Sequence, residues 1–132
     1  MRHVYKFFIL TILIGSIGLK VNGQKFNAPA WADTLKNPLK NNTAAAAEGK
    51  KLYTQYCVVC HGEKGKGDGP SVAGLQKKPA NHTTDEFQKQ SDGIIFWKIS
   101  NGSSPMPGFK SALKTKQIWQ LVDYTRTFAA KK

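Results

Sequence analysis

Apolar residues recur at helical spacing in three segments of this chain, and the first is the alanine-rich run 44–56. Alanine is the strongest helix former, and Thr43 in front of the run is a suitable N-cap. One face of this predicted helix carries small or apolar residues three and four positions apart: Gly49, Leu52, Tyr53 and Tyr56. A glycine inside a helix costs about 1 kcal/mol relative to alanine. Gly49 therefore indicates that another helix approaches closely.

A second helix is predicted over about 93–100, with Ser91 or Asp92 as its cap and Asn101-Gly102 as its end. Its apolar residues fall on more than one face, and Trp97 is among them. A helix of this kind is usually buried. We expect Trp97 to belong to the core, and to a cofactor contact as well if a cofactor forms part of that core.

The last predicted helix follows a cap at Thr115 and runs over about 116–128. It has a broad apolar face, which consists of Ile118, Trp119, Leu121, Val122 and Tyr124. We expect this face to pack against Gly49 and Tyr53 of the first helix. Helices are the only elements that the pattern predicts, so the fold class is all-α.

The first 23 residues differ from the rest of the chain. A basic start with Arg2, His3 and Lys6 precedes the apolar run 7–19, and compact residues follow it at 21–23. This pattern is typical of a secretory signal peptide. A buried helix or an uncleaved anchor is the alternative, but the run is shorter than the roughly 20 residues that span a membrane.

The segment 24–42 is polar and contains Pro29 and Pro38, so it is predicted to be an arm on the surface, held by Trp31 and Leu35. The remaining residues, 43–132, are enough for one small domain. The predicted organisation is therefore a signal peptide over 1–23, an arm over 24–42 and a domain over 43–132.

The strongest chemical signal is Cys57-Val58-Val59-Cys60-His61, which is the attachment pattern of a c-type haem. Each thiol can form a thioether with one vinyl group, and the histidine can then bind the iron. A Cys-x-x-Cys pair is also found in thioredoxin-like redox sites, in zinc sites and in disulfides. A zinc site needs more ligands, and the other histidines are only His3 and His82.

Further residues are candidates for the surroundings of one haem. The glycine-rich loop 62–70 ends at Pro70, whose carbonyl can accept a hydrogen bond from the His61 ring and orient it. Leu75 is a candidate for apolar packing against the porphyrin. His82 rivals His61 as a ligand, but an isolated histidine is more often an exposed loop residue, and we expect that role for it.

Met106 lies between Pro105 and Pro107, in a segment that cannot be helical. A thioether is a soft ligand suited to haem iron, and a Met/His pair raises the reduction potential. The alternative is a core methionine that fills a gap. With a haem attached at His61 and its sixth position open, we favour Met106 as the second iron ligand.

Taken in order, these residues resemble the class I cytochromes c in their small monohaem bacterial form. The resemblance covers about 48–128 and rests on the following positions: Gly49, Tyr53, Cys57, Cys60, His61, Gly69-Pro70, Gly74-Leu75, Met106-Pro107, Leu121 and Tyr124. It implies three to five helices around one covalent haem c, with crossing first and last helices. It also implies that the Pro70 carbonyl holds His61 and that Met106 is the distal ligand. The arm lies outside it.

The resemblance implies single-electron transfer rather than catalysis, because no nucleophile or acid–base pair is visible. The net charge is +12, and removing Arg2, Lys6 and Lys20 with the signal leaves 17 basic residues against 8 acidic ones. A basic exported domain of this kind suits redox partners with acidic docking patches, although solubility alone also explains surface lysines. Neither nucleic acid nor a membrane span after signal cleavage is expected.

Two other functions remain open at this point. The domain can be a haem subunit that relays electrons inside a terminal oxidase or a periplasmic dehydrogenase, with the arm as its docking segment. Alternatively, a five-coordinate haem can act as a peroxidase or gas sensor, which requires that Met106 does not bind. The expected location is the periplasm or another exported compartment.

Overall fold

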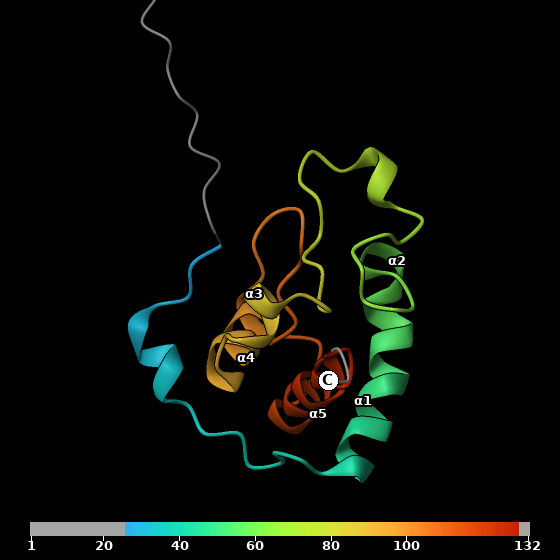
Figure 1. Ribbon diagram of the computed structural model, residues 1–132. Coiled ribbons are helices and arrows are strands. Elements are labelled where there is room, and N and C mark those ends of the chain that lie inside the picture. Colours follow the sequence, from blue (N-terminus) through green and yellow to red (C-terminus); the bar gives the residue numbers. More distant parts are fainter. Residues whose placement is uncertain (1–25, 130–132) are drawn as a thin grey trace, which may run out of the picture.

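Helices form the regular structure of the protein in the computed structural model, which describes residues 26–129 (Figure 1). Within this range the α-helices are α1 Thr43–Tyr56, α2 Val58–His61, α3 Asp85–Gln88, α4 Asp92–Asn101 and α5 Thr115–Arg126. Two short 3-10 helices, η1 Ala30–Thr34 and η2 Val72–Gly74, lie in the connecting segments. Over these residues there is no β-strand, so the all-α prediction is confirmed. The predicted signal peptide lies outside the described residues.

The three predicted helices are present, and their first turns show why they begin where they do. The Asn42 side chain caps α1 by accepting from the Ala45 N–H at 3.0 Å, so this helix begins one residue earlier than predicted. Ser91 caps α4 by accepting from the Ile94 N–H at 3.2 Å. α5 begins at Thr115 itself.

The helices are also too short or too polar to span a membrane, as far as residues 26–129 are concerned.

α1 and α5 pack directly against each other, as Gly49 predicted. A Cβ atom at Gly49 would overlap the carbonyl oxygen of Gln120 and come within 2.9 Å of the Tyr124 Cβ. Tyr53 is 1% exposed and meets the Tyr124 ring edge-on at 5.1 Å between centroids. The absence of a side chain at Gly49 therefore allows the two backbones to approach, and the aromatic rings fill the space beside them.

The core lies between this helix pair and α4. Its most deeply buried side chains are Tyr53, Ile95, Leu121 and Val122. Phe96 of α4 stacks on Trp119 of α5, with ring centroids 4.1 Å apart and planes tilted by 21°. The apolar residues on several faces of α4 thus correspond to a helix that is covered on more than one side.

The arm passes outside α4 and then leads to the start of α1 (Figure 1). Ala32 in η1 is fully buried, and a Cβ atom at Gly93 would overlap the Ala32 carbonyl oxygen. Leu35 packs against the core as predicted. The prediction for Trp31 is wrong, since this side chain is 57% exposed. The arm lies close to α4 because Ala32 and Gly93 are small at the point of contact, and not because a large side chain such as Trp31 is buried there.

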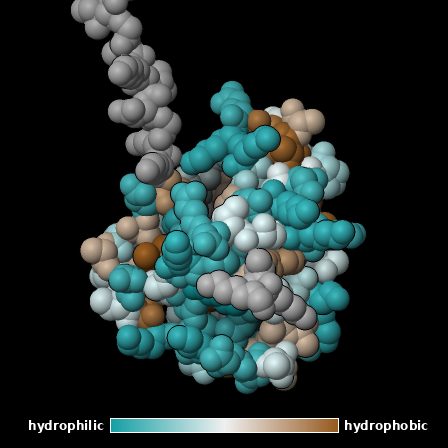
Figure 2. Space-filling model, viewed as in Figure 1, coloured by the Kyte–Doolittle hydropathy of each residue, from teal (hydrophilic) through white to brown (hydrophobic). Residues whose placement is uncertain are grey.

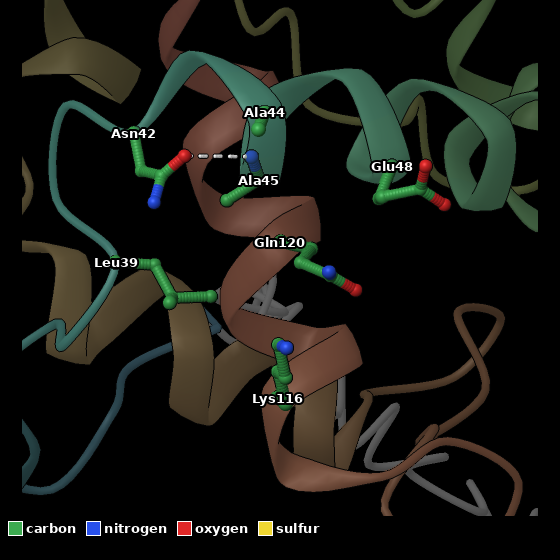
Figure 3. A pocket seen from close by; sticks show the side chains of 7 residues that line it. All are labelled: Leu39, Asn42, Ala44, Ala45, Glu48, Lys116 and Gln120. Atoms are coloured by element: carbon green, nitrogen blue, oxygen red, sulfur yellow. Dashed lines mark hydrogen bonds between the residues drawn. The ribbon is translucent and has the colours of Figure 1, made fainter.

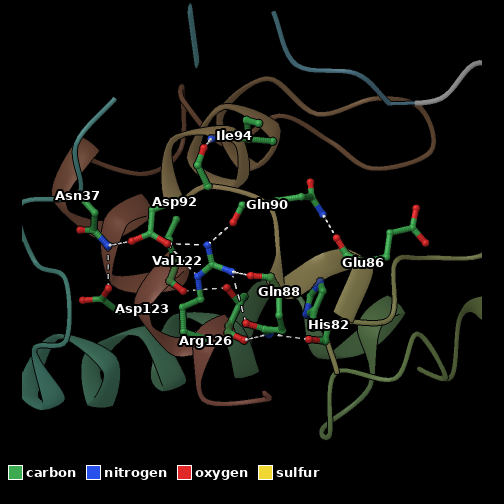
Figure 4. Close-up of polar contacts among 12 residues, drawn as sticks. Asn37, His82, Glu86, Gln88, Gln90, Asp92, Ile94, Val122, Asp123 and Arg126 are labelled. Atoms are coloured by element: carbon green, nitrogen blue, oxygen red, sulfur yellow. Dashed lines mark hydrogen bonds and ion pairs between the residues drawn. The ribbon is translucent and has the colours of Figure 1, made fainter. Parts of the chain in front are cut away.

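A polar network fastens the arm and α4 to α5 (Figure 4). The Asn37 Nδ2 donates to Asp92 Oδ2 at 3.0 Å and to Asp123 Oδ1 at 2.8 Å. Arg126 donates to Asp92 Oδ1 from Nε at 2.8 Å and from Nη2 at 2.6 Å. The guanidinium also donates to the backbone carbonyls of Gln88 and Gln90 at 2.9 and 2.6 Å. One arginine therefore ties the ends of α3, α4 and α5 together.

Hydrophilic residues cover most of the face shown in Figure 2, and hydrophobic residues appear there in small separate groups. This is the surface expected of a chain in which charged residues make up 21% of the sequence and basic ones predominate.

Candidate haem-binding site

Cys57 lies at the junction between α1 and α2, Cys60 lies within α2, and the helical hydrogen bonding continues through the attachment motif. The Cys57 N–H donates to the Tyr53 carbonyl at 2.8 Å, and the His61 N–H donates to the Cys57 carbonyl at 2.8 Å. Both cysteines are half-buried free thiols. Burial, with a smaller contribution from Cys60, raises the pKa of the Cys57 thiol to about 12. The two thiols and the imidazole therefore come from one short helical turn, as attachment of one porphyrin requires.

His61 is held by a backbone carbonyl. Its ring is buried, and Nδ1 lies 3.1 Å from the Ala80 carbonyl oxygen. Burial lowers the pKa of His61, and the Ala80 carbonyl partly opposes this effect. When Nδ1–H donates to that carbonyl, Nε2 is the ring nitrogen left to bind a metal.

The predicted hydrogen bond from His61 to the Pro70 carbonyl is wrong. Pro70 is exposed, and its loop is fastened to the backbone of α2 instead. The Gly69 N–H donates to the Cys60 carbonyl at 3.1 Å, and the Ser71 N–H donates to the Val59 carbonyl at 2.9 Å. The chain returns to the His61 ring only ten residues after Pro70, at Ala80.

The prediction that His82 is an exposed loop residue is also wrong. It is 6% exposed and stacks on the His61 ring, with centroids 4.4 Å apart and planes 22° from parallel. Burial, and to a lesser extent the charge of His61, lowers the pKa of His82 to about 3. Its polar surroundings in the sequence concealed this position, and no local signal would have revealed it.

The stacked arrangement bears on the choice of iron ligands. Two imidazoles that bind one iron from opposite sides must point their nitrogens toward each other across the metal. The His61 and His82 rings instead lie face to face. In this arrangement they do not form such a ligand pair.

Met106 lies in the helix-free loop that its flanking prolines predicted. The Ser103 and Met106 backbones exchange two hydrogen bonds, each 2.9 Å long. The methionine side chain is half-buried and packs against the hydrophobic core.

Leu75 and Trp97 are both half-buried. Leu75 follows η2, and Trp97 on α4 meets the Phe26 ring of the arm at a centroid distance of 6.0 Å. The roles of Leu75 and Trp97 toward a haem stay predictions.

A separate cleft of about 210 Å³ opens where the arm meets α1 and α5 (Figure 3). Its lining residues are Leu39, Asn42, Ala44, Ala45, Glu48, Lys116 and Gln120. None of the residues that the sequence predicted for the haem site belongs to it.

Comparison with known proteins agrees with this picture. Residues 44–124 match the family described as cytochrome C oxidase, cbb3-type, subunit III. A cytochrome c6 from Nostoc sp. is 26% identical over 119 residues, covering 90% of this chain and 89% of that protein. The quinohemoprotein alcohol dehydrogenase ADH-IIG of Pseudomonas putida is 34% identical over 94 residues, covering 70% of this chain. The chain spans only 12% of that dehydrogenase.

A solved structure is also similar. It is the Kuenenia stuttgartiensis reducing HAO-like protein complex Kustc0457/Kustc0458, with a TM-score of 0.65 and 28% sequence identity. The match covers 73% of this chain and 50% of the chain in that complex.

The helical fold and the Cys57–His61 turn define a small c-type cytochrome domain of the electron-transport class. Because the family match covers more than half of the chain, the protein belongs to the family of cytochrome C oxidase, cbb3-type, subunit III. Its cofactor is one haem c, bound covalently through Cys57 and Cys60. The residues fit this group, since two free thiols share a helical turn with an imidazole whose Nδ1 is already engaged.

Proposed function

We propose that the protein is an exported monohaem cytochrome that carries single electrons between redox proteins, with His61 and Met106 as the iron ligands. The observation that carries this proposal is the hydrogen bond between His61 Nδ1 and the Ala80 carbonyl, 3.1 Å long, at the end of the attachment turn. It fixes the ring tautomer and makes Nε2 the donor atom for a metal. The haem iron supplies the one-electron couple.

Met106 is the best second ligand on the grounds of chemistry and position. It is the only methionine besides the initiator, and the hydrogen bonds between Ser103 and Met106 give its loop a defined shape. Its half-buried side chain belongs to the edge of the core. With both axial positions filled, no position is open for a substrate, which favours electron transfer over peroxidase or gas-sensing chemistry.

The charge of the chain supports docking to acidic partners. After removal of the predicted signal peptide, 17 basic residues remain against 8 acidic ones, a net charge of about +9. A positive protein of this size is drawn toward acidic surfaces at low salt. Electron-transfer rates with an acidic partner should therefore fall as the ionic strength rises.

A second candidate function is that of a haem subunit within a larger complex. It is favoured by the similarity to a chain of the HAO-like complex. Copurification with another protein in a fixed ratio would support it, whereas a free monomer would support the soluble carrier. The inner side of the arm is occupied by α4, so docking through the arm would use its outer face, where Trp31 is exposed.

The ligand assignment is tested by replacing Met106. In Met106→Ala, the weak far-red absorption of a methionine–iron pair should disappear from the oxidised spectrum, and the reduction potential should fall. Ser104→Ala, an exposed change in the same loop, is the matched control and should leave both unchanged. If Met106→Ala has the spectrum of the unchanged protein, Met106 is not a ligand and the five-coordinate alternative gains support.

A further inference from the structure

Aromatic rings enclose His82, which the proposed ligand set leaves without a role. Phe87 lies 4.4 Å from it, and Tyr53 and Phe128 lie 6.0 and 6.1 Å away, between ring centroids. The His61 ring covers another side at 4.4 Å. The Nδ1 atom of His82 has no hydrogen-bond partner. The surrounding rings therefore contact the flat faces of the His82 ring, and its buried Nδ1 atom takes no part in a hydrogen bond.

The backbone N–H and the backbone carbonyl of His82 are both held by hydrogen bonds. Its N–H donates to the Gly65 carbonyl at 2.6 Å, and its carbonyl accepts from Gln88 Nε2 at 2.7 Å. Gln88 is itself held, because it donates to the Thr125 carbonyl at 3.0 Å and receives Arg126 at its own carbonyl (Figure 4). The backbone at position 82 is thus attached to α3 and α5, so the His82 residue cannot shift freely with His61.

One loop restrains the His61 imidazole in two ways. The Ala80 carbonyl engages Nδ1 at the edge of the ring, and His82, two residues later, lies against its face. The hydrogen bond at Nδ1 orients the ring from one edge. A second ring stacked on its face adds a further restraint on its rotation and also covers the ring from water.

We propose that His82 is a positioning residue that fixes the rotation of the His61 imidazole and shields it from water. This inference rests on the proposed function, because it requires His61 to be an iron ligand. Ring stacking, and not the basicity of His82, is the property that matters. A phenyl ring should therefore replace His82, whereas an aliphatic side chain of similar bulk should not.

Three variants of the haem-loaded protein separate these properties. His82→Phe keeps a flat ring, His82→Leu keeps bulk without a plane, and His82→Ala keeps neither. Val122→Ala is the control for general loss of packing, since Val122 is fully buried in α5. The measurements are the electron paramagnetic resonance spectrum of the oxidised protein, which responds to the orientation of the axial imidazole, and the reduction potential.

We expect His82→Phe to retain the resonance positions and the potential of the unchanged protein. His82→Leu should shift or broaden the resonances because the His61 ring can turn. His82→Ala should do the same and also lower the potential, because water that reaches the ring favours the oxidised, more highly charged iron. Val122→Ala should lose stability without moving the resonances.

Two results would overturn this role. One is a set of resonances in His82→Leu identical to those of the unchanged protein, and the other is an equal shift in His82→Phe and His82→Leu. The comparison of Phe with Leu decides the question even if His82→Ala does not fold. Failure of the proposed function looks different, because the unchanged protein itself would then lack the low-spin spectrum of two strong axial ligands.

Discussion

Asp123 is the residue with the least favourable surroundings in the polar network. Its side chain is buried, Oδ1 accepts from Asn37, and Oδ2 has no hydrogen-bond partner. Burial is the main cause that raises its pKa, while the Asn37 hydrogen bond opposes the rise and the nearby Asp92 charge adds to it. A raised pKa means that the folded protein holds this proton more tightly than the unfolded chain does.

Asp123→Asn should therefore stabilise the protein at neutral pH, by about 1 kcal/mol, which is the low end of the cost of an unsatisfied buried group. The amide oxygen can still accept from Asn37. The advantage should shrink as the pH falls through the raised pKa, because the wild-type carboxyl is then neutral too. Urea unfolding at several pH values tests this, with exposed Asp33→Asn as the control. An advantage that is constant with pH would contradict this explanation.

At the level of single residues, the sequence predicted correctly those residues that come together because they are close in the chain. Cys57, Cys60 and His61 lie within five positions, so their proximity does not depend on the fold. The hydrogen-bond acceptor for His61 lies 19 positions away in the chain, at Ala80. Its identity depends on the path of the intervening loop, which the sequence pattern does not reveal, and the prediction therefore named Pro70 instead. The burial of His82 depends on rings from α1, α3 and the end of the chain, and no pattern around it reveals them.

At the level of elements, the three long helices were predicted to within two residues at both of their ends. Their apolar periodicity and caps are strong signals. The four-residue helices α2 and α3 were missed, because one helical turn has no periodicity to detect. The pairing of α1 with α5 was predictable because Gly49 is otherwise unfavourable inside a helix.

Gly49→Ala tests that pairing. Helix propensity alone predicts a gain of about 1 kcal/mol. The added methyl would overlap the Gln120 carbonyl oxygen, and such overpacking costs about 1–3 kcal/mol. We therefore expect a lower urea midpoint. Ala47→Gly, on the exposed side of α1, is the control and should lose only the propensity contribution. A higher midpoint for Gly49→Ala would show that α1 and α5 can separate at little cost.

At the level of the whole molecule, the arm is the part that the sequence described least well. Prolines and polar residues indicated a surface segment, and the structure indeed places it outside α4. Its attachment depends on Asn37, whose two acceptors are 55 and 86 positions away in the chain. Interactions of such long range leave no trace in local composition.

Asn37→Ala should loosen the arm and lower the free energy of unfolding by about 2 kcal/mol, because the buried Asp123 carboxylate is left without a donor. Proteolysis within 26–42 should become faster, while the haem spectrum should not change. Thr34→Ala, which removes only an exposed hydrogen bond to the Trp31 carbonyl, is the control. In the Asp123→Asn background, Asn37→Ala should cost less. An equal cost in both backgrounds would exclude the carboxylate as the cause.

The contact between Gly49 and Gln120 also dictates an order of assembly. These residues are separated by about 70 positions, so the core cannot close until almost the whole chain is available, and closing so long a loop is entropically costly and slow. During synthesis, the Cys57–His61 turn therefore emerges well before α5 is complete. Cys57 and Cys60 stay uncovered by the last helix until it packs against α1.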